Sequence, residues 1–399
     1  MKHDTKFLDG IRLCLALWVA LGHFYKYIGG ASFAQLPYFM RPFMDATPAV
    51  DGFMVITGFL MMYHYTLRED KELPTAASTI NKFYLRRFFR LFPLYSLAIL
   101  ANYLLFSVNN GFLYDSYQHL SGHAPRFDTT YDPGKYPDFW DVFLHLTFLH
   151  GFVPGRNVSL LGPAWSLSLE MQFYILFPLL FLFFTKRPQL RVPLTILVSV
   201  GLYVLADKLF GNWARPGRLV DFGAPSLIIH KFLYFIVGML LSQVLLKRLN
   251  PYYLLFILVL SVRVIPPISF AVTMLITVFM FTHELKERVP AWIYNAIEAC
   301  KKIFSGKVGK FGADISYSLY LLHMLLLPAI LHYTIALGFD KVTTVVIALI
   351  LFVAINFVLG YVLYRTLEKP FILMGKRLLE KKYPTELVPS IRTSHLAEQ

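Results

Sequence analysis

The chain has 399 residues, of which 56% are hydrophobic and 17% are aromatic, and its mean hydropathy is +0.54. Only 16% are charged, against about 25% in a typical soluble domain, so the composition excludes an ordinary soluble enzyme and indicates a polytopic membrane protein. The formal net charge is +14, but the basic residues lie between hydrophobic runs, which indicates membrane topology rather than nucleic-acid binding. The two cysteines, Cys14 and Cys300, predict no disulfide framework.

Ten apolar runs are long enough, or nearly so, to cross a bilayer as helices. They cover residues 7–28, 48–67, 85–107, 166–185, 192–209, 228–247, 251–264, 267–283, 314–336 and 342–366. The seventh and eighth are short and are separated by Pro266 and Pro267. We therefore predict an all-α fold of about ten transmembrane helices, with a membrane domain over residues 1–383 and a polar, disordered tail over residues 384–399.

The distribution of Lys and Arg predicts the orientation of these helices. Most of the 38 Lys and Arg residues fall in segments that are cytoplasmic if both termini are inside. The longest loop, 108–165, is then extracytoplasmic, and it is rich in Gly, Pro, Tyr, Asp and His, as expected of a segment that faces substrate. Within it, 139–152 predicts an interfacial or re-entrant piece, whereas 290–304 predicts an amphipathic helix on the inner leaflet. The expected location is the inner or plasma membrane.

The first apolar run contains two ionisable residues, Arg12 and His23, eleven positions apart. At about 100° per residue they share one helix face, separated by roughly 16 Å along the axis. Ionisable residues inside a span are costly and mark candidates for a functional site. Alternatively, Arg12 snorkels to the inner headgroups and His23 lies at the outer interface. With Asp9 one turn before Arg12, the stripe favours a polar path with a function.

Three arginines, Arg86, Arg87 and Arg90, lie where the third run meets the cytoplasm, and Arg87 and Arg90 share one helix face. Positive-inside anchoring is sufficient to explain such a cluster. The functional alternative is a guanidinium clamp for phosphates, which arginine binds in bidentate fashion. A phosphorylated donor would then enter from the inner side.

Two carboxylates enter apolar runs from the predicted outer side. Glu170 lies about one turn into the fourth run, after Trp165 and Ser166, and Asp51 opens the second run. A buried carboxylate needs a partner or a proton. Glu170 is thus a candidate for chemistry or for an ion pair that joins helices. Asp51 is a candidate for chemistry or for a charge at a helix N-terminus.

The ninth run places Ser316, Tyr320 and His323 on adjacent helix faces, and a packing histidine and a catalytic one are both consistent with this position. A glycosylation sequon begins at Asn157. The sequence contains no metal-ligand spacing, Walker loop, Rossmann glycine pattern or GxSxG elbow. We therefore predict no metal, and we expect any chemistry to take place in the membrane or at its faces.

Taken together, six segments resemble the acyltransferase-3 family of integral membrane O-acyltransferases. They are Leu8–Arg12 with His23 ten residues further on, Asp51–Phe59, Arg86–Tyr95, Trp165–Tyr174, Ile315–His323 and Leu367–Phe371. The segments occur in the family's order and span residues 8–371, which fits the family's plan of ten spans. One departure is Thr57, which stands where the family usually has Ser.

The resemblance implies an acyl donor, usually acetyl-CoA, on the cytoplasmic side. It also implies an extracytoplasmic acceptor, usually a sugar hydroxyl on a surface glycan or a lipid-linked saccharide. Arg12 and His23 correspond to the family's Arg-x10-His motif, and Arg87 and Arg90 to its Arg-x-x-Arg motif. The CoA phosphates are then expected to bind Arg86, Arg87 and Arg90, with Arg12 nearby. A succinyl or longer acyl group is an alternative to acetyl.

His23 is expected to act as a general base on the acceptor hydroxyl or to become transiently acylated. Glu170, the acidic residue after the family's Trp-Ser-Leu, or Asp51 would orient its imidazole, as in a triad. The other candidates for substrate contact or structural support are Trp165, Ser166, Tyr320 and His323.

Some family members carry a C-terminal esterase-like transferase domain, whereas this chain ends at residue 399 without one. We therefore expect it either to modify the acceptor itself or to pass the acyl group to a separate periplasmic or extracellular transferase. Membrane lipids are the other expected partners. The main alternative function is a proton-coupled transporter, against which the sequence shows no inverted repeat and clusters its polar groups at both faces. A scaffold without chemistry is a third possibility.

Overall fold

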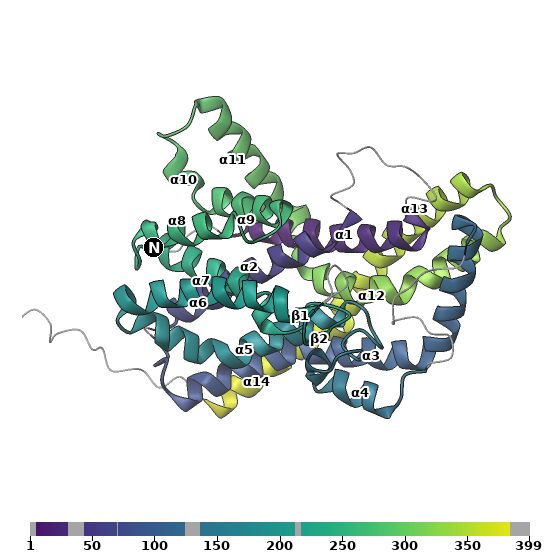
Figure 1. Cartoon of the computed structure of the whole chain (residues 1–399), viewed down its shortest axis with the longest axis horizontal. Helices are drawn as coiled ribbons and strands as arrows, with labels where there is room; N and C mark the ends of the chain where they lie inside the picture. Colours follow the sequence, from purple (N-terminus) through teal and green to yellow (C-terminus); the bar gives the residue numbers. More distant parts are fainter. Residues whose placement is uncertain (1–4, 31–43, 70, 124–135, 212–216, 384–399) are drawn as a thin grey trace, which may run out of the picture.

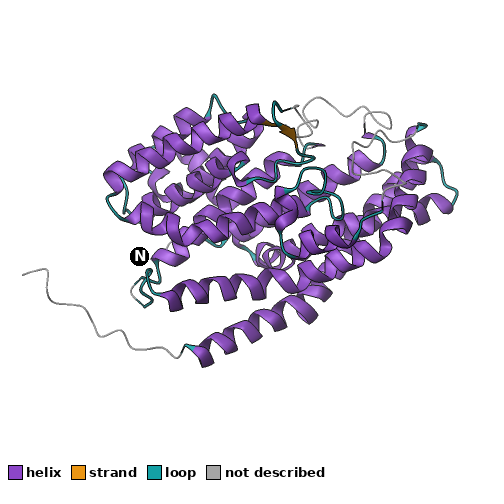
Figure 2. Cartoon of the chain, turned by 60° about the horizontal axis from the view of Figure 1, so that its bottom comes forward, coloured by secondary structure: helices purple, strands orange, loops and turns teal. Residues whose placement is uncertain are grey.

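The computed structural model describes residues 5–30, 44–69, 71–123, 136–211 and 217–383, so the predicted tail 384–399 lies outside the described residues. Helices make up most of the described chain, and they lie side by side in a bundle (Figures 1 and 2). The strands in this part are β1 (Phe210–Gly211) and β2 (Val220–Asp221), which form a short parallel pair. The all-α prediction is confirmed.

Each of the ten predicted runs folds as a helix over most of its length. The helices are α1 (Phe7–Tyr27), α2 (Thr47–Thr66), α3 (Ala77–Ser121), α5 (Ala164–Thr185), α6 (Pro188–Leu209), α7 (Phe232–Leu245) after the 3-10 turn η4 (Ile228–His230), α8 (Pro251–Ser261), α9 (Pro267–Met280), α12 (Lys307–Ala336) and α13 (Lys341–Leu363). A π-helical turn, η5 (Tyr364–Glu368), joins α13 to α14 (Lys369–Lys382).

Among the described residues, six helical stretches have the length and hydropathy of membrane spans: α1, α3, α5, α6, α12 and the continuous helix over 341–382. Helices α7, α8 and α9 are shorter and apolar. The chain is therefore a multi-pass membrane protein. The count of ten spans and the cytoplasmic position of both termini stay predictions.

Helix α3 is much longer than the predicted run. Its 45 residues make it roughly 68 Å long, about twice the hydrocarbon thickness of a bilayer. The expected loop over 108–165 is therefore wrong in its first part, because the helix continues to Ser121. The reason is contact with α12. The Asn109 amide donates to a backbone carbonyl of α12 at 3.3 Å, and the ring of Phe112 stacks on His332 with centroids 3.9 Å apart.

The two short segments predicted to lie at membrane surfaces are also helical. Residues 139–152 form α4 (Phe139–Leu146) and the 3-10 turn η3 (Leu149–Phe152). Of residues 290–304, all but Pro290, which precedes the helix, fall in α11 (Ala291–Ser305), none of whose residues is fully buried. In Figure 1, α11 projects from the bundle together with α10 (Thr282–Leu285). Their positions relative to the bilayer stay predictions.

Helices α2 and α7 run parallel and form the tightest packing in the bundle. A Cβ at Gly58 would overlap a backbone carbonyl of α7, and one at Gly238 would overlap a backbone carbonyl of α2. Small residues allow helix backbones to touch in this way within a membrane. At the ends of the two helices, the Gln243 amide donates to the Thr66 hydroxyl at 2.9 Å. This contact holds the end of α2 against the end of α7. Helix α2 also carries Asp51 and Thr57, which belong to two different polar clusters.

Helix α1 packs parallel to α12, with α11 against its start. A Cβ at Gly10 would lie 2.6 Å from the backbone of Phe304 in α11, so a side chain at this position would push the two helices apart. Further along, a Cβ at Gly312 of α12 would lie 2.6 Å from the Cβ of Leu13. These close approaches set the rotation of α1 and turn Arg12 toward the interior of the bundle.

Candidate functional site

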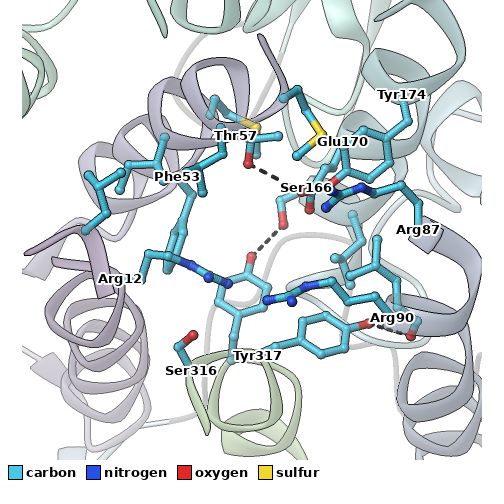
Figure 3. Close-up of a pocket in the computed structure, with 18 of the residues that line it drawn as sticks. Arg12, Phe53, Thr57, Arg87, Arg90, Ser166, Glu170, Tyr174, Ser316 and Tyr317 are labelled. Carbon is cyan, nitrogen blue, oxygen red and sulfur yellow. Dashed lines mark hydrogen bonds between the residues drawn. The ribbon is translucent and has the colours of Figure 1, made fainter. Parts of the chain in front are cut away.

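A cavity of about 350 Å³ lies between α1, α2, α3, α5 and α12 (Figure 3). Its lining includes the exposed residues Lys6 and His64, so it reaches the surface at the end of the bundle where α1 begins and α2 ends. If the N-terminus is cytoplasmic, as predicted, this is the cytoplasmic side. The polar or charged side chains that line its interior are those of Asp9, Arg12, Thr57, Arg87, Arg90, Ser166, Glu170, Tyr174, Ser316, Tyr317 and Tyr320.

Three arginines give the cavity its charge. In Figure 3, Arg12 and Arg90 point toward one another across the space, and Arg87 lies beside Glu170. The guanidinium of Arg87 stacks over the Tyr174 ring at 5.5 Å. Among the described residues, no carboxylate oxygen lies within 4.0 Å of these guanidinium groups. A partly buried cluster of cations without close counter-charges favours a bound anion.

Glu170 lies on the wall of this cavity. One of its carboxylate oxygens, Oε1, accepts a hydrogen bond from the Thr57 hydroxyl at 3.3 Å and another from the Tyr174 hydroxyl. Thr57, the departure from the resembled pattern, therefore supplies the same hydroxyl that a serine would. The hydrogen-bond donors of Glu170 are neutral, and together with Asp9 this carboxylate partly balances the charges of the arginines that line the cavity.

Ser166 and Tyr320 meet on the wall of the cavity. Their hydroxyl oxygens lie 2.7 Å apart, and the Tyr320 hydroxyl also lies 3.2 Å from the backbone carbonyl of Pro163. The adjacent Tyr317 donates from its hydroxyl to a carbonyl of α3 at 2.8 Å. These contacts tie α12 to α5 and α3. Trp165, next to Ser166, is buried in the main apolar core and does not line the cavity.

His23 lies outside the cavity lining and meets a residue of α12. Its Nδ1 is 3.1 Å from Nε2 of His323 and 3.0 Å from the carbonyl oxygen of Val19. Neither Glu170 nor Asp51 is among its hydrogen-bond partners in the described part of the chain. The structure thus places the two members of the expected Arg-x10-His motif at different sites, with Arg12 in the cavity and His23 in a histidine pair.

Asp51 is in a closed ion pair away from the cavity. It is 0% exposed, its Oδ1 lies 2.6 Å from Nζ of Lys231, and its Oδ2 accepts from the Ser269 hydroxyl at 2.7 Å. The pair joins the starts of α2, α7 and α9. The expected contact between Asp51 and His23 is therefore not formed, because Lys231 and Ser269 occupy both carboxylate oxygens.

Arg86 also points away from the cavity. Its guanidinium donates to both carboxylate oxygens of Glu72, at 2.8 and 3.3 Å. Burial raises the pKa of Glu72, but the hydrogen bond and charge of Arg86, together with Lys82 and Arg68, lower that pKa below its usual value. Arg86 thus fastens the start of α3 to the preceding connection, while its neighbours Arg87 and Arg90 line the cavity.

The sequon residue Asn157 is fully buried. Its amide nitrogen donates to the Ala224 carbonyl and to the Ser226 hydroxyl, both at 3.0 Å. The folded chain therefore does not present this side chain to a glycosylating enzyme. Sequence reasoning gave no role to three residues that matter here: Lys231, Tyr174 and the buried Glu368, which accepts from Ser318. A signal existed for Lys231 and Glu368, because both are charged residues beside or within apolar runs.

A polytopic helical bundle with a cationic cavity between its helices defines a multi-pass membrane protein with a charged internal site. Comparison with known families is more specific. The family model described as "Acyltransferase domain" matches residues 5–365, and the chain belongs to this acyltransferase-3 family.

The chain is also 28% identical over 228 residues to "Nose resistant to fluoxetine protein 6" of Caenorhabditis elegans. The aligned part is 52% of this chain and 25% of that protein, so the chain spans about a quarter of the relative's length. No solved structure matches the chain.

Proposed function

We propose that this protein transfers an acyl group, acetyl in the simplest case, from cytoplasmic acyl-CoA to a hydroxyl of an extracytoplasmic glycan or glycolipid. The observation that carries the proposal is the cavity lined by Arg12, Arg87 and Arg90, whose charges exceed those of the two carboxylates among its described lining residues, Asp9 and Glu170. CoA has three phosphates, so its charge matches an excess of guanidinium groups. The protein would act as a multi-pass protein of the inner or plasma membrane.

The phosphates of the donor would bind at the arginines, and its thioester would react near the histidine pair. The arginines share the cavity with Lys6 and His64, which are exposed and give the donor a route from the surface. The uncharged pantetheine arm would extend inward past Ser166 and Tyr320 toward the histidine pair. Arg12 and His23 are separated by roughly 16 Å along α1, a distance that an extended pantetheine arm spans. The acyl group would thus cross much of the membrane while still attached to CoA.

In the proposed reaction, the acceptor oxygen attacks the thioester carbonyl carbon. The new C–O ester bond forms, the C–S bond breaks, His23 takes the hydroxyl proton, and that proton passes to the departing CoA sulfur. Glu170 contacts Thr57 and Tyr174 rather than His23, so we assign it to the donor cavity. Transfer to a separate transferase instead of a glycan would use the same donor site.

The test is release of free CoA by purified protein in liposomes supplied with acetyl-CoA and a panel of glycan acceptors. The double variant Arg87→Ala/Arg90→Ala should weaken donor binding by at least about a hundredfold, since each of the two charge-assisted contacts contributes on the order of 1.5–3 kcal/mol. Arg86→Ala is the matched control, because this neighbouring arginine binds Glu72 outside the cavity, and it should leave donor affinity unchanged.

The proposal fails if intact wild-type protein, with acceptors present, releases no CoA. Movement of a solute across the liposome without CoA consumption would instead identify a transporter. Equal losses of donor affinity in Arg86→Ala and in the double variant would contradict the assignment of the cavity as the donor site.

A further inference from the structure

Beyond the cavity, the most informative cluster of titratable groups is the histidine pair between α1 and α12. We propose that His323 is the positioning residue of His23, and that it accepts the Nδ1 proton of His23 in the role that a carboxylate has in a triad. This inference rests on the proposed function, in which His23 is the general base. It differs from the sequence-based expectation, which gave that role to Glu170 or Asp51.

The pair is built by the packing of two parallel helices. Leu13 of α1 lies against Gly312 of α12, and in the same register His23 reaches His323. The ring centroids are 5.0 Å apart, and His323 is 0% exposed. A side chain fixed by surrounding packing can hold its partner in one orientation, which is what a positioning residue requires.

The hydrogen bonds determine which nitrogen carries each proton. A backbone carbonyl oxygen can only accept, so Nδ1 of His23, 3.0 Å from the Val19 oxygen, must carry a hydrogen. The Nε2 atom of His323 lies 3.1 Å from the same Nδ1, so it accepts that hydrogen in a three-centre bond shared with the Val19 oxygen. It follows that Nε2 of neutral His23 is unprotonated and available to take a proton from a hydroxyl.

The same assignment requires a proton on Nδ1 of His323. This atom is buried without a hydrogen bond of good geometry, and the acceptors that act on the ring are the backbone carbonyls of Leu319 and Tyr320, one turn earlier in α12. A buried ring nitrogen with poorly aligned acceptors is costly. An apolar residue at position 323 would avoid the cost of burying this nitrogen. What a histidine provides there and an apolar residue does not is the contact with His23.

Within the described part of the chain, no carboxylate takes part in the pair. The titratable groups that act on His23 are His323 from α12 and Lys26 from α1 itself. Glu170 and Asp51 are both engaged elsewhere. A pair of neutral imidazoles places no permanent charge inside the membrane, which avoids the cost of a buried ion while the site waits for substrate.

The pair also lies next to the donor cavity. Ser316 and Tyr320 line the cavity, and His323 follows them at helical spacing on the same side of α12. The ring centroid of Tyr320 is 6.0 Å from that of His323. A donor whose phosphates bind at the arginines would therefore present its thioester at the Tyr320 end of the cavity, beside the pair.

Three variants at His323 test the proposal in acetyl-CoA turnover by the protein in liposomes. His323→Leu removes the acceptor, and we expect a fall in kcat of about ten- to hundredfold with KM for acetyl-CoA unchanged. His323→Gln keeps an oxygen near the position of Nε2 and should retain kcat within about threefold of wild type. His332→Leu, on the same helix, is the control that should leave turnover unchanged.

The third variant, His323→Glu, separates positioning from simple packing. A carboxylate beside His23 favours the protonated ring, so the acidic limb of the pH–rate profile should move to higher pH. If His323→Leu keeps the wild-type kcat, or if all three variants lose activity equally with an unchanged pH profile, the inference is wrong. Absence of CoA release by wild-type protein would overturn the proposed function and this inference with it.

Discussion

Asp51 and Glu170 look alike in the sequence, since each is an acidic residue within an apolar helix, but the structure gives them opposite surroundings. Asp51 is 0% exposed and has a lysine and a serine on its two oxygens. Glu170 is partly exposed to a cavity, and its hydrogen-bond partners, Thr57 and Tyr174, are neutral. The charge of Asp51 is neutralised by Lys231, whereas Glu170 belongs to a cluster of side chains whose net charge is positive.

The difference teaches how to separate a structural buried charge from a functional one. Asp51 and Lys231 satisfy each other, and their contact joins the starts of three helices. Around Glu170 the arginine charges exceed the carboxylate charge, and the excess faces an accessible space. Burial of charge is common to both regions, so the criterion that identifies the site is incomplete neutralisation beside a cavity.

The largest expected effect comes from breaking the buried ion pair between Asp51 and Lys231. Lys231→Met leaves the Asp51 carboxylate buried without its counter-charge, and the free energy of unfolding should fall by about 3–5 kcal/mol. The double variant Asp51→Leu/Lys231→Met should recover most of that loss, because two apolar side chains need no counter-charge. Thermal and denaturant unfolding in one defined detergent would measure both. A single variant as stable as wild type would contradict the structural role.

His145 and His150 form a second buried pair, outside the membrane-spanning helices. Their rings stack with centroids 4.1 Å apart. Burial lowers the pKa of His150 from 6.5 to about 4 and also lowers that of His145. Because the unfolded state binds more protons in this range, stability should decrease as the pH falls from about 6.5 to about 4. The loss is on the order of 3 kcal/mol for His150 alone.

Unfolding measured across this pH range tests the effect, with His150→Gln as the matched variant. Glutamine can still donate to the Ala164 carbonyl that His150 Nε2 contacts at 3.1 Å, but it does not titrate. The variant should therefore lose most of the pH dependence. An identical pH dependence in wild type and variant would show that other groups cause it.

The smallest effect is expected at Glu170. Glu170→Gln removes the negative charge but keeps an oxygen that accepts from Thr57, so stability should change by less than about 1 kcal/mol. CoA binding should tighten by roughly three- to tenfold, because the phosphates no longer face a carboxylate among the arginines. Calorimetric titration with CoA at two salt concentrations would measure this. Weaker binding in the variant would mean that Glu170 itself holds the donor.

Helix periodicity predicted the short-range part of the site and could not predict the long-range part. Helix periodicity places Arg87 and Arg90 on one helix face and Arg86 on another. In the structure, Arg87 and Arg90 line the cavity, whereas Arg86 binds Glu72. The partner of His23 is His323, which is distant in the chain, and neither residue's pattern specifies the other. Spacing along one helix defines a face, but the opposing residue depends on how the helices pack.

Two other differences have the same physical origin. The expected loop after residue 107 is polar in sequence, yet it stays helical to Ser121 because α12 provides contacts along its side. Lys231 stands at the start of an apolar run on the predicted outer side, where basic residues are sparse. That position was a signal for a buried ion pair, although the sequence did not show that Asp51 is its partner.

The cavity wall draws on helices from both ends of the chain, α1, α2, α3 and α5 from the first half and α12 from beyond residue 306. During biosynthesis the earlier helices enter the membrane while α12 is still untranslated, so a nascent chain has the arginines but not the wall that carries Ser316 and Tyr320. The site is therefore completed only after α12 has been made and has packed against the earlier helices. Until then, a partly inserted protein has the arginines but no closed cavity around them.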